Sequence, residues 1–119
     1  MPKNLHRSMT PAEFHACVPL VPQLSSERVS AARAVLVDDE KQVDVATRHG
    51  ITRQAVNTSV KVMWETFQTY QAAKRIEVDM TEAALPPGWR VATVVAPGEM
   101  LDRLCADVAA AAAAAGVEL

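Results

Sequence analysis

The chain has 119 residues, of which half are hydrophobic and 4% aromatic, so it can form one domain whose core is mainly aliphatic. The formal net charge is −2, no apolar run approaches the roughly 18 residues of a membrane-spanning helix, and no apolar segment of a signal peptide follows the N-terminus. Cys17 and Cys105 lie far apart and form no metal-binding motif, so we expect two buried, reduced thiols, no metal, no cofactor and a cytoplasmic location.

Two short helices are expected before residue 40. Residues 10–13, Thr-Pro-Ala-Glu, have the pattern of a capping box with proline at the first helical position, and Phe14 begins the apolar side of this helix. A second helix is expected from about 25 to 37. The acidic turn at residues 38–40 is then expected to cap a third helix.

Residues 41–67 have the spacing of a helix-turn-helix. We expect one helix from about 41 to 49 and a second from Thr52, its cap, to about 74. The motif needs a small residue where the helices cross, a glycine in the turn, an apolar residue beneath the turn and another inside the second helix. These positions are filled by Ala46, Gly50, Ile51 and Val56. An ordinary α-hairpin in a helical domain is the alternative that this spacing leaves open.

The exposed side of the second helix carries side chains suited to DNA. Arginine binds guanine edges, glutamine and asparagine bind adenine edges, and threonine contacts a thymine methyl group or a phosphate. We therefore expect base contacts from Thr52, Arg53, Gln54, Asn57 and Thr58. Phosphate contacts are expected from the preceding helix and one turn farther along the second, at Lys41, Gln42, Thr47, Arg48 and Lys61. The alternative for any one of them is an ordinary solvated side chain.

The small net charge conceals a marked segregation. Residues 41–75 contain six basic and two acidic side chains, a formal charge of +4, whereas residues 76–119 contain two basic and seven acidic side chains, a formal charge of −5. Affinity for DNA depends on the field at the contacting surface rather than on the total charge. The middle of the chain is therefore the part expected to bind DNA.

The C-terminal part is expected to mediate dimerisation. Residues 76–88 are interpreted as a linker and residues 89–95 as a lone strand. A helix with an alanine-rich end is expected from about residue 97, and Gly116 is expected to stop it. One strand cannot satisfy its own backbone groups, so we expect it to pair with the same strand of a second copy; the alternative is a strand packed singly on the helical domain. The residues expected at this dimer contact are Trp89, Val91, Thr93, Val95, Leu101 and Leu104. The expected fold is thus mainly α, with a helical DNA-binding domain at 1–75 and a strand–helix dimerisation module at 89–119.

Several stretches, taken in order, resemble the TrfB/KorA family of plasmid transcriptional repressors. They are residues 34–38, 46–47, 50–53, 55–56, 60, 62, 64 and 67, and, after the linker, 85–89, 91, 93, 95 and 97. The resemblance implies a homodimer that binds palindromic operators of plasmid genes and dimerises through its C-terminal segment. Thr52, Arg53, Ala55 and Val56 match the opening of the family's recognition helix.

This sequence also departs from the family pattern at several places. Gln54, Asn57, Thr58 and Lys61 differ at base-reading positions, so the operator need not be the family's. The N-terminal arm is longer, residues 76–84 form an acidic insert and the tail is rich in alanine.

We therefore expect a bacterial, plasmid- or nucleoid-associated repressor, not an enzyme, that occupies DNA as a homodimer and blocks polymerase. His6, His15 and His49 are scattered and suggest no catalytic site. Another repressor and RNA polymerase are the candidate further partners. A dimeric protein-interaction adaptor, or an antitoxin-like module with a helix-turn-helix, is the alternative function.

Overall fold

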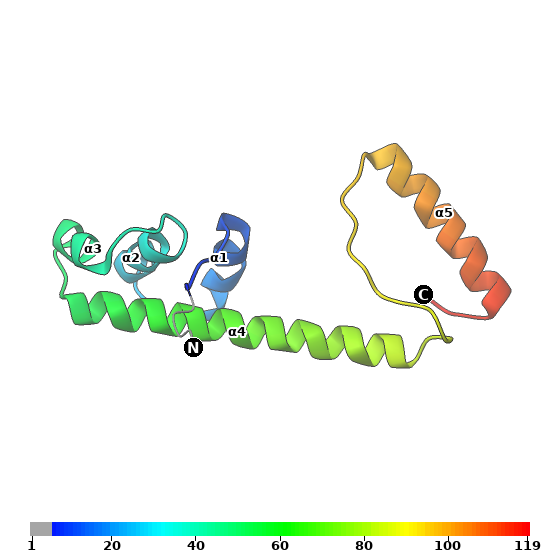
Figure 1. Ribbon diagram of the computed structural model, residues 1–119, viewed down its shortest axis with the longest axis horizontal. Helices are drawn as coiled ribbons and strands as arrows, with labels where there is room; N and C mark the ends of the chain where they lie inside the picture. Colours follow the sequence, from blue (N-terminus) through cyan, green and yellow to red (C-terminus); the bar gives the residue numbers. More distant parts are fainter. Residues whose placement is uncertain (1–5) are drawn as a thin grey trace. The chain divides into compact units, whose positions relative to one another are not determined.

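A computed structural model describes residues 6–119, and every regular element in that range is helical (Figure 1). The elements are α1 (Pro11–Cys17), the 3-10 helix η1 (Val18–Leu20), α2 (Ser26–Leu36), α3 (Gln42–His49), α4 (Arg53–Ala83) and α5 (Gly98–Ala115). The chain forms two compact units, Met1–Ala73 and Lys74–Leu119, which are described separately. Helix α4 begins in the first unit and ends in the second.

Side-chain caps position the first two helices, and the capping box of the first is the one that the sequence predicts. The Thr10 hydroxyl accepts the Glu13 backbone N–H at 3.1 Å, and the Glu13 carboxylate accepts the Thr10 backbone N–H at 2.9 Å, which completes the capping box of α1. The Ser25 hydroxyl accepts the Arg28 backbone N–H at 3.2 Å and so caps α2. These local bonds set the starts of both helices before any packing is considered.

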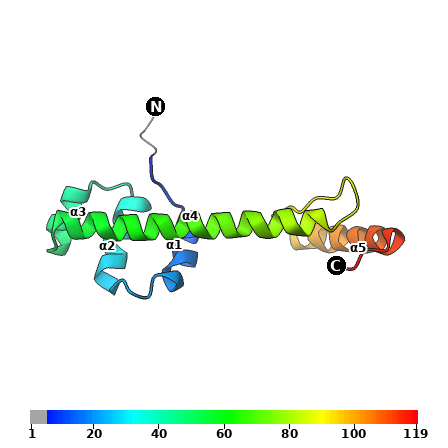
Figure 2. The same cartoon turned by 90° about the horizontal axis from the view of Figure 1, so that it is seen from below.

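The core of the first unit forms where α1, α2 and α3 lie along one side of the first part of α4 (Figures 1 and 2). Its largest fully buried side chains come from every one of these segments and the loops between them: Leu36, Met63, Val21, Val45, Val56, Val60, Cys17 and Ser59. Ser59 is the buried polar residue of this set, and its hydroxyl donates to the Ala55 carbonyl at 2.8 Å. The core therefore holds the start of α4 rigidly while its outer side stays exposed.

The predicted strand at residues 89–95 is wrong, and the predicted strand–helix dimerisation module is not present. The segment is extended but belongs to no sheet, and residues 6–119 contain no strand with which it pairs. Neither set of alternating side chains is buried: Val95 is 95% exposed and Val94 is 51% exposed. A hydrogen bond joins the segment to the end of α4: the Val91 backbone N–H donates to the Glu82 carboxylate at 2.7 Å.

Helix α4 is also longer than expected, because residues 76–83 are helical rather than linker. This stretch contains no helix breaker, since the first proline after Thr52 is Pro86 and the first glycine is Gly88. An ion pair between Arg75 and Asp79, at 3.7 Å and one turn apart, supports the extension.

Helix α5 ends at Gly116, which adopts the left-handed conformation with φ 72°, as the sequence predicts. Its apolar stripe is largely unburied, with Met100 52%, Leu104 44% and Val108 40% exposed. Among the described residues of α5, Ala112 is the buried one. This helix therefore presents an apolar side that the second unit does not cover.

The two cysteines differ from one another, contrary to the expectation that both are buried. Cys17 is fully buried in the first unit, and burial, reinforced by the nearby Glu13 carboxylate, raises the pKa of its thiol. Cys105 is exposed on α5. None of the helices within residues 6–119 is long and apolar enough to cross a bilayer.

Candidate nucleic-acid interface

The turn between α3 and α4 has the geometry that a helix-turn-helix requires. Gly50 adopts φ 65°, and the backbone N–H groups of Gly50 and Ile51 both reach the carbonyl of Ala46, the latter at 3.1 Å. The Thr52 hydroxyl then accepts the Ala55 N–H at 3.0 Å and caps α4. The predicted roles of Gly50 and Thr52 in this turn are confirmed.

Gly50→Ala is expected to destabilise the protein by about 1–2 kcal/mol, because the left-handed backbone conformation is sterically unfavourable for alanine. A Cβ at this position would meet no atom within 4 Å, so a clash with neighbouring side chains is not the cause. Gly98→Ala is the matched control, since its Cβ also meets nothing and its φ lies outside the left-handed region. Urea unfolding of both variants measures the difference. Equal free energies of unfolding for the two would contradict the strain argument.

The start of α4 presents a continuous polar surface opposite the core. Its exposed residues are Thr52, Arg53, Gln54, Asn57, Thr58 and Lys61. Val56, Ser59 and Val60, which alternate with them at helical spacing, are buried. Within residues 6–119, neither Arg53 nor Lys61 forms an ion pair, so both cations face solvent.

Gln42 joins the predicted base-reading residues to the predicted phosphate-binding residues. It lines one shallow depression with Arg53, Gln54 and Asn57, and an adjoining depression with Lys41, Arg53 and Asn57. The N-terminus of α3 is therefore adjacent to the start of α4. This arrangement suits a duplex, because phosphates flank the groove into which the bases project.

Arg48 lies in a different environment from the one expected of a phosphate ligand. Its guanidinium donates to both carboxylate oxygens of Glu40, the second contact being 3.2 Å between Nη2 and Oε2. The hydrogen bond from Arg48 is the main reason why the pKa of the Glu40 carboxyl is lowered. The Arg48 charge is thus already balanced within the protein. The sequence offered no signal for this pair, because its members are eight residues apart and only one of them lies on α3.

Thr47 and Lys41 complete the set of predicted phosphate ligands. The Thr47 hydroxyl donates to the Val43 carbonyl at 3.0 Å, so its proton is committed within α3. Lys41 is the N-cap of α3 and makes no side-chain capping bond; the predicted cap from the acidic turn at residues 38–40 is therefore wrong. Instead, Asp39 adopts φ 58°, and the Glu40 carboxylate pairs with Arg48.

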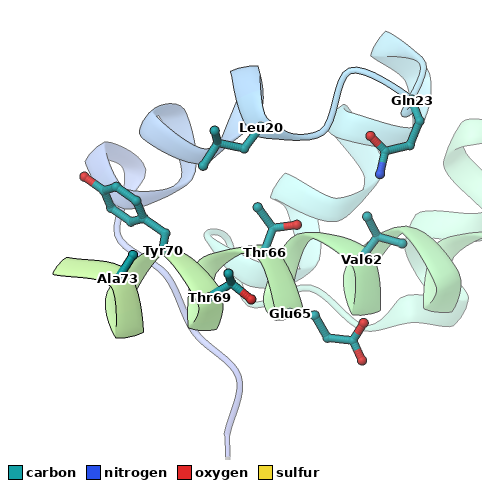
Figure 3. Close-up of a pocket in the computed structure, with 8 residues that line it drawn as sticks. All are labelled: Leu20, Gln23, Val62, Glu65, Thr66, Thr69, Tyr70 and Ala73. Atoms are coloured by element: carbon teal, nitrogen blue, oxygen red, sulfur yellow. The ribbon is translucent and has the colours of Figure 1, made fainter. Parts of the chain in front are cut away.

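A groove not anticipated from the sequence lies on another side of α4. It has a volume of about 640 Å³ and lies between α4 and the segment containing Leu20 and Gln23 (Figure 3). Its α4 side is lined by Val62, Glu65, Thr66, Thr69, Tyr70 and Ala73. Glu65, its charged lining residue, follows Lys61 by one helical turn and is exposed. A carboxylate here repels phosphate, so the surface suited to DNA ends near Lys61.

No curated protein matches the chain. A protein-family comparison matches the TrfB plasmid transcriptional repressor family, also called KorA, over residues 9–87. The matched range contains the whole helix-turn-helix and ends before the extended segment at 89–95. Since the match covers well over half of the chain and its helix-turn-helix has the required geometry, the chain belongs to the TrfB/KorA family of plasmid transcriptional repressors.

Proposed function

We propose that this repressor binds a palindromic operator as a homodimer and that the first turns of α4 read its bases. The observation that carries the proposal is the cluster of exposed Arg53, Gln54 and Asn57 around Gln42, on a helix whose opposite side is locked in the core. Arginine and the two amides provide donors and acceptors for guanine and adenine edges in the major groove. Thr52 and Thr58 flank the cluster. Lys41 and Lys61, which form no ion pair within residues 6–119, are the cations proposed to contact phosphate.

Repression in this proposal is steric. Two copies related by a two-fold axis place their recognition helices in successive major grooves, about 34–36 Å apart, and so cover one side of the duplex. An operator that overlaps a promoter is then closed to polymerase. The basic surface at the start of α4 supplies sequence-independent attraction to the phosphates, and the base contacts select the site.

Selection of bound duplexes from a random-sequence pool tests this function. Repeated recovery of one palindrome, with half-sites centred about 10 base pairs apart or at a multiple of that spacing, is the expected result. Recovery of no preferred sequence, with binding that only weakens as salt rises, would instead favour the protein-interaction adaptor.

The proposed homodimer needs a contact between copies, and the exposed stripe of α5 is the best candidate. Leu101, Leu104 and Val108 recur at the spacing of an amphipathic helix. Packing this stripe against the same stripe of a second copy removes it from water. Trp89 and the exposed Val91, Thr93 and Val95 precede α5 and lie in the same unit, so they stay candidates for the margin of that contact.

Leu104→Glu is expected to convert the homodimer to a monomer, because a charge replaces an apolar group at the centre of the stripe and its burial is costly. Light scattering on the full chain measures the mass, which should fall to half. Ala106→Glu is the matched control: it introduces the same charge on exposed α5 surface, two residues and so about 200° around the helix from Leu104, and should leave the mass unchanged. A Leu104→Glu protein that keeps the dimer mass would exclude the α5 stripe as the contact.

A further inference from the structure

The N-terminal arm is held beside the helix-turn-helix. Met9 is 3% exposed, and its backbone N–H donates to the Leu36 carbonyl at 2.9 Å, which ties the arm to the end of α2. Three residues earlier, His6 Nε2 lies 3.2 Å from the Asp39 carboxylate in the turn between α2 and α3. These two contacts determine where Arg7, between them, leaves the surface.

Arg7 lies next to the proposed DNA surface. With His6 it lines a depression whose other walls are Val35, the carboxylates Asp39 and Glu40, Gln42 of α3 and Val60 of α4. Gln42 also lines the neighbouring depression formed with Arg53, Gln54 and Asn57. The arm therefore reaches the same side of α4 that contacts α3, about one helical turn beyond Asn57.

The turn beside the arm is acidic, but Arg7 forms no ion pair with it. Of its three carboxylates, at Asp38, Asp39 and Glu40, Glu40 pairs with Arg48 and Asp39 lies 3.2 Å from His6 Nε2. Arg7 is exposed and forms no ion pair with any residue in the range 6–119. A guanidinium that is free, exposed and held next to a DNA-reading surface fits a phosphodiester, which it can bind through two parallel hydrogen bonds.

We propose that Arg7 is a DNA-backbone ligand and that the N-terminal arm extends the interface beyond the helix-turn-helix to a phosphate flanking the bases read by α4. The inference rests on the proposed operator binding and adds a contact that the family match, which begins at residue 9, does not include. A backbone contact of this kind strengthens binding without choosing the sequence. It also compensates for Arg48, whose charge is engaged by Glu40.

Arg7→Gln in the full chain tests the proposal by the dependence of the dissociation constant on salt. The variant should bind the selected operator and every substituted operator more weakly, by the same factor for each. The slope of the logarithm of the binding constant against the logarithm of the salt concentration should shrink by about 0.9 for each protomer bound. Arg103→Gln is the control, since it removes the same charge from the exposed surface of the second unit. In an ethylation-interference experiment, ethylation of one backbone phosphate per half-site should weaken binding of the wild-type protein and of Arg103→Gln. Ethylation of the same phosphate should no longer affect binding of Arg7→Gln.

Asp39→Asn separates direct contact from neutralisation of the acidic turn. If Arg7 merely offsets Asp39, the Arg7→Gln, Asp39→Asn double variant recovers wild-type binding and slope, and the proposal is overturned. If Arg7 contacts phosphate, the reduced slope persists in the Asp39→Asn background. The salt dependence of binding can also be measured on a duplex of random sequence, so this test does not require a selected palindrome. An Arg7→Gln slope equal to that of the wild type on this duplex would refute the arm contact. Failure to select any palindrome would instead refute the operator function.

Discussion

Met63→Ala is expected to lower the free energy of unfolding by about 2–5 kcal/mol, the range found when a large core side chain is cut back and leaves a cavity. Met63 is fully buried on α4, where it packs among the residues that hold α1, α2 and α3 on this helix. A loss of this size approaches the whole stability of a small domain. Operator binding at 37 °C should therefore fall with the folded fraction. Chemical denaturation followed by circular dichroism measures the change.

Met80→Ala is the control for this prediction, because it makes the same chemical change on the same helix. Met80 is 71% exposed, so its truncation leaves no cavity and should change the free energy of unfolding by less than about 0.5 kcal/mol. Similar losses for the two variants would show that helix propensity, rather than core packing, governs the stability of α4.

Arg53→Ala is expected to weaken operator binding by about 1–3 kcal/mol, roughly 5- to 150-fold, and to relax specificity at one base pair. Arg53 is exposed at the first position of α4, beside Gln54 and Asn57, and has no acidic partner within residues 6–119. Its guanidinium is therefore free to bind the O6 and N7 atoms of a guanine. Dissociation constants for the operator and for each substituted operator, at one salt concentration, provide the measurement.

Lys61→Ala is the comparison for Arg53→Ala. Both remove one exposed cation from α4, but Lys61 lies two turns farther along and is expected to contact phosphate. Its loss should weaken all operator variants equally and reduce the salt slope. If Arg53→Ala also weakens every variant equally, Arg53 is a backbone ligand and not a base reader.

Helix starts and stops were predictable because they depend on neighbouring residues. The capping box at Thr10, the cap at Thr52, and the glycine stops at Gly50 and Gly116 each rest on bonds or backbone angles within a few residues. The linker expected from residue 76 is wrong for residues 76–83, because an acidic, polar composition does not by itself end a helix. The better signal was the absence of proline and glycine from Arg53 to Leu85, which leaves nothing to stop the helix.

The strand was predicted from composition, and composition is a weak guide for strands. Val91, Val94 and Val95 favour extended backbone, but a sheet also needs a neighbouring strand to accept and donate its hydrogen bonds. Residues 6–119 offer none, so the segment is extended and exposed. A helix closes its own hydrogen bonds, which is why the helical predictions succeeded where this one failed.

The sequence by itself determined the helix-turn-helix, because the spacing of Ala46, Gly50, Ile51 and Val56 reflects the local geometry of two crossing helices. It also determined which α4 side chains face away from the core. The tertiary structure alone decided which charges are free. Arg48, expected at phosphate, is balanced by Glu40, whereas Arg7, which no motif identified, is held beside Gln42 with its charge exposed. Ion pairing depends on distances across loops, and those distances follow from the packing of α2, α3 and the arm on α4 rather than from any periodicity in the chain.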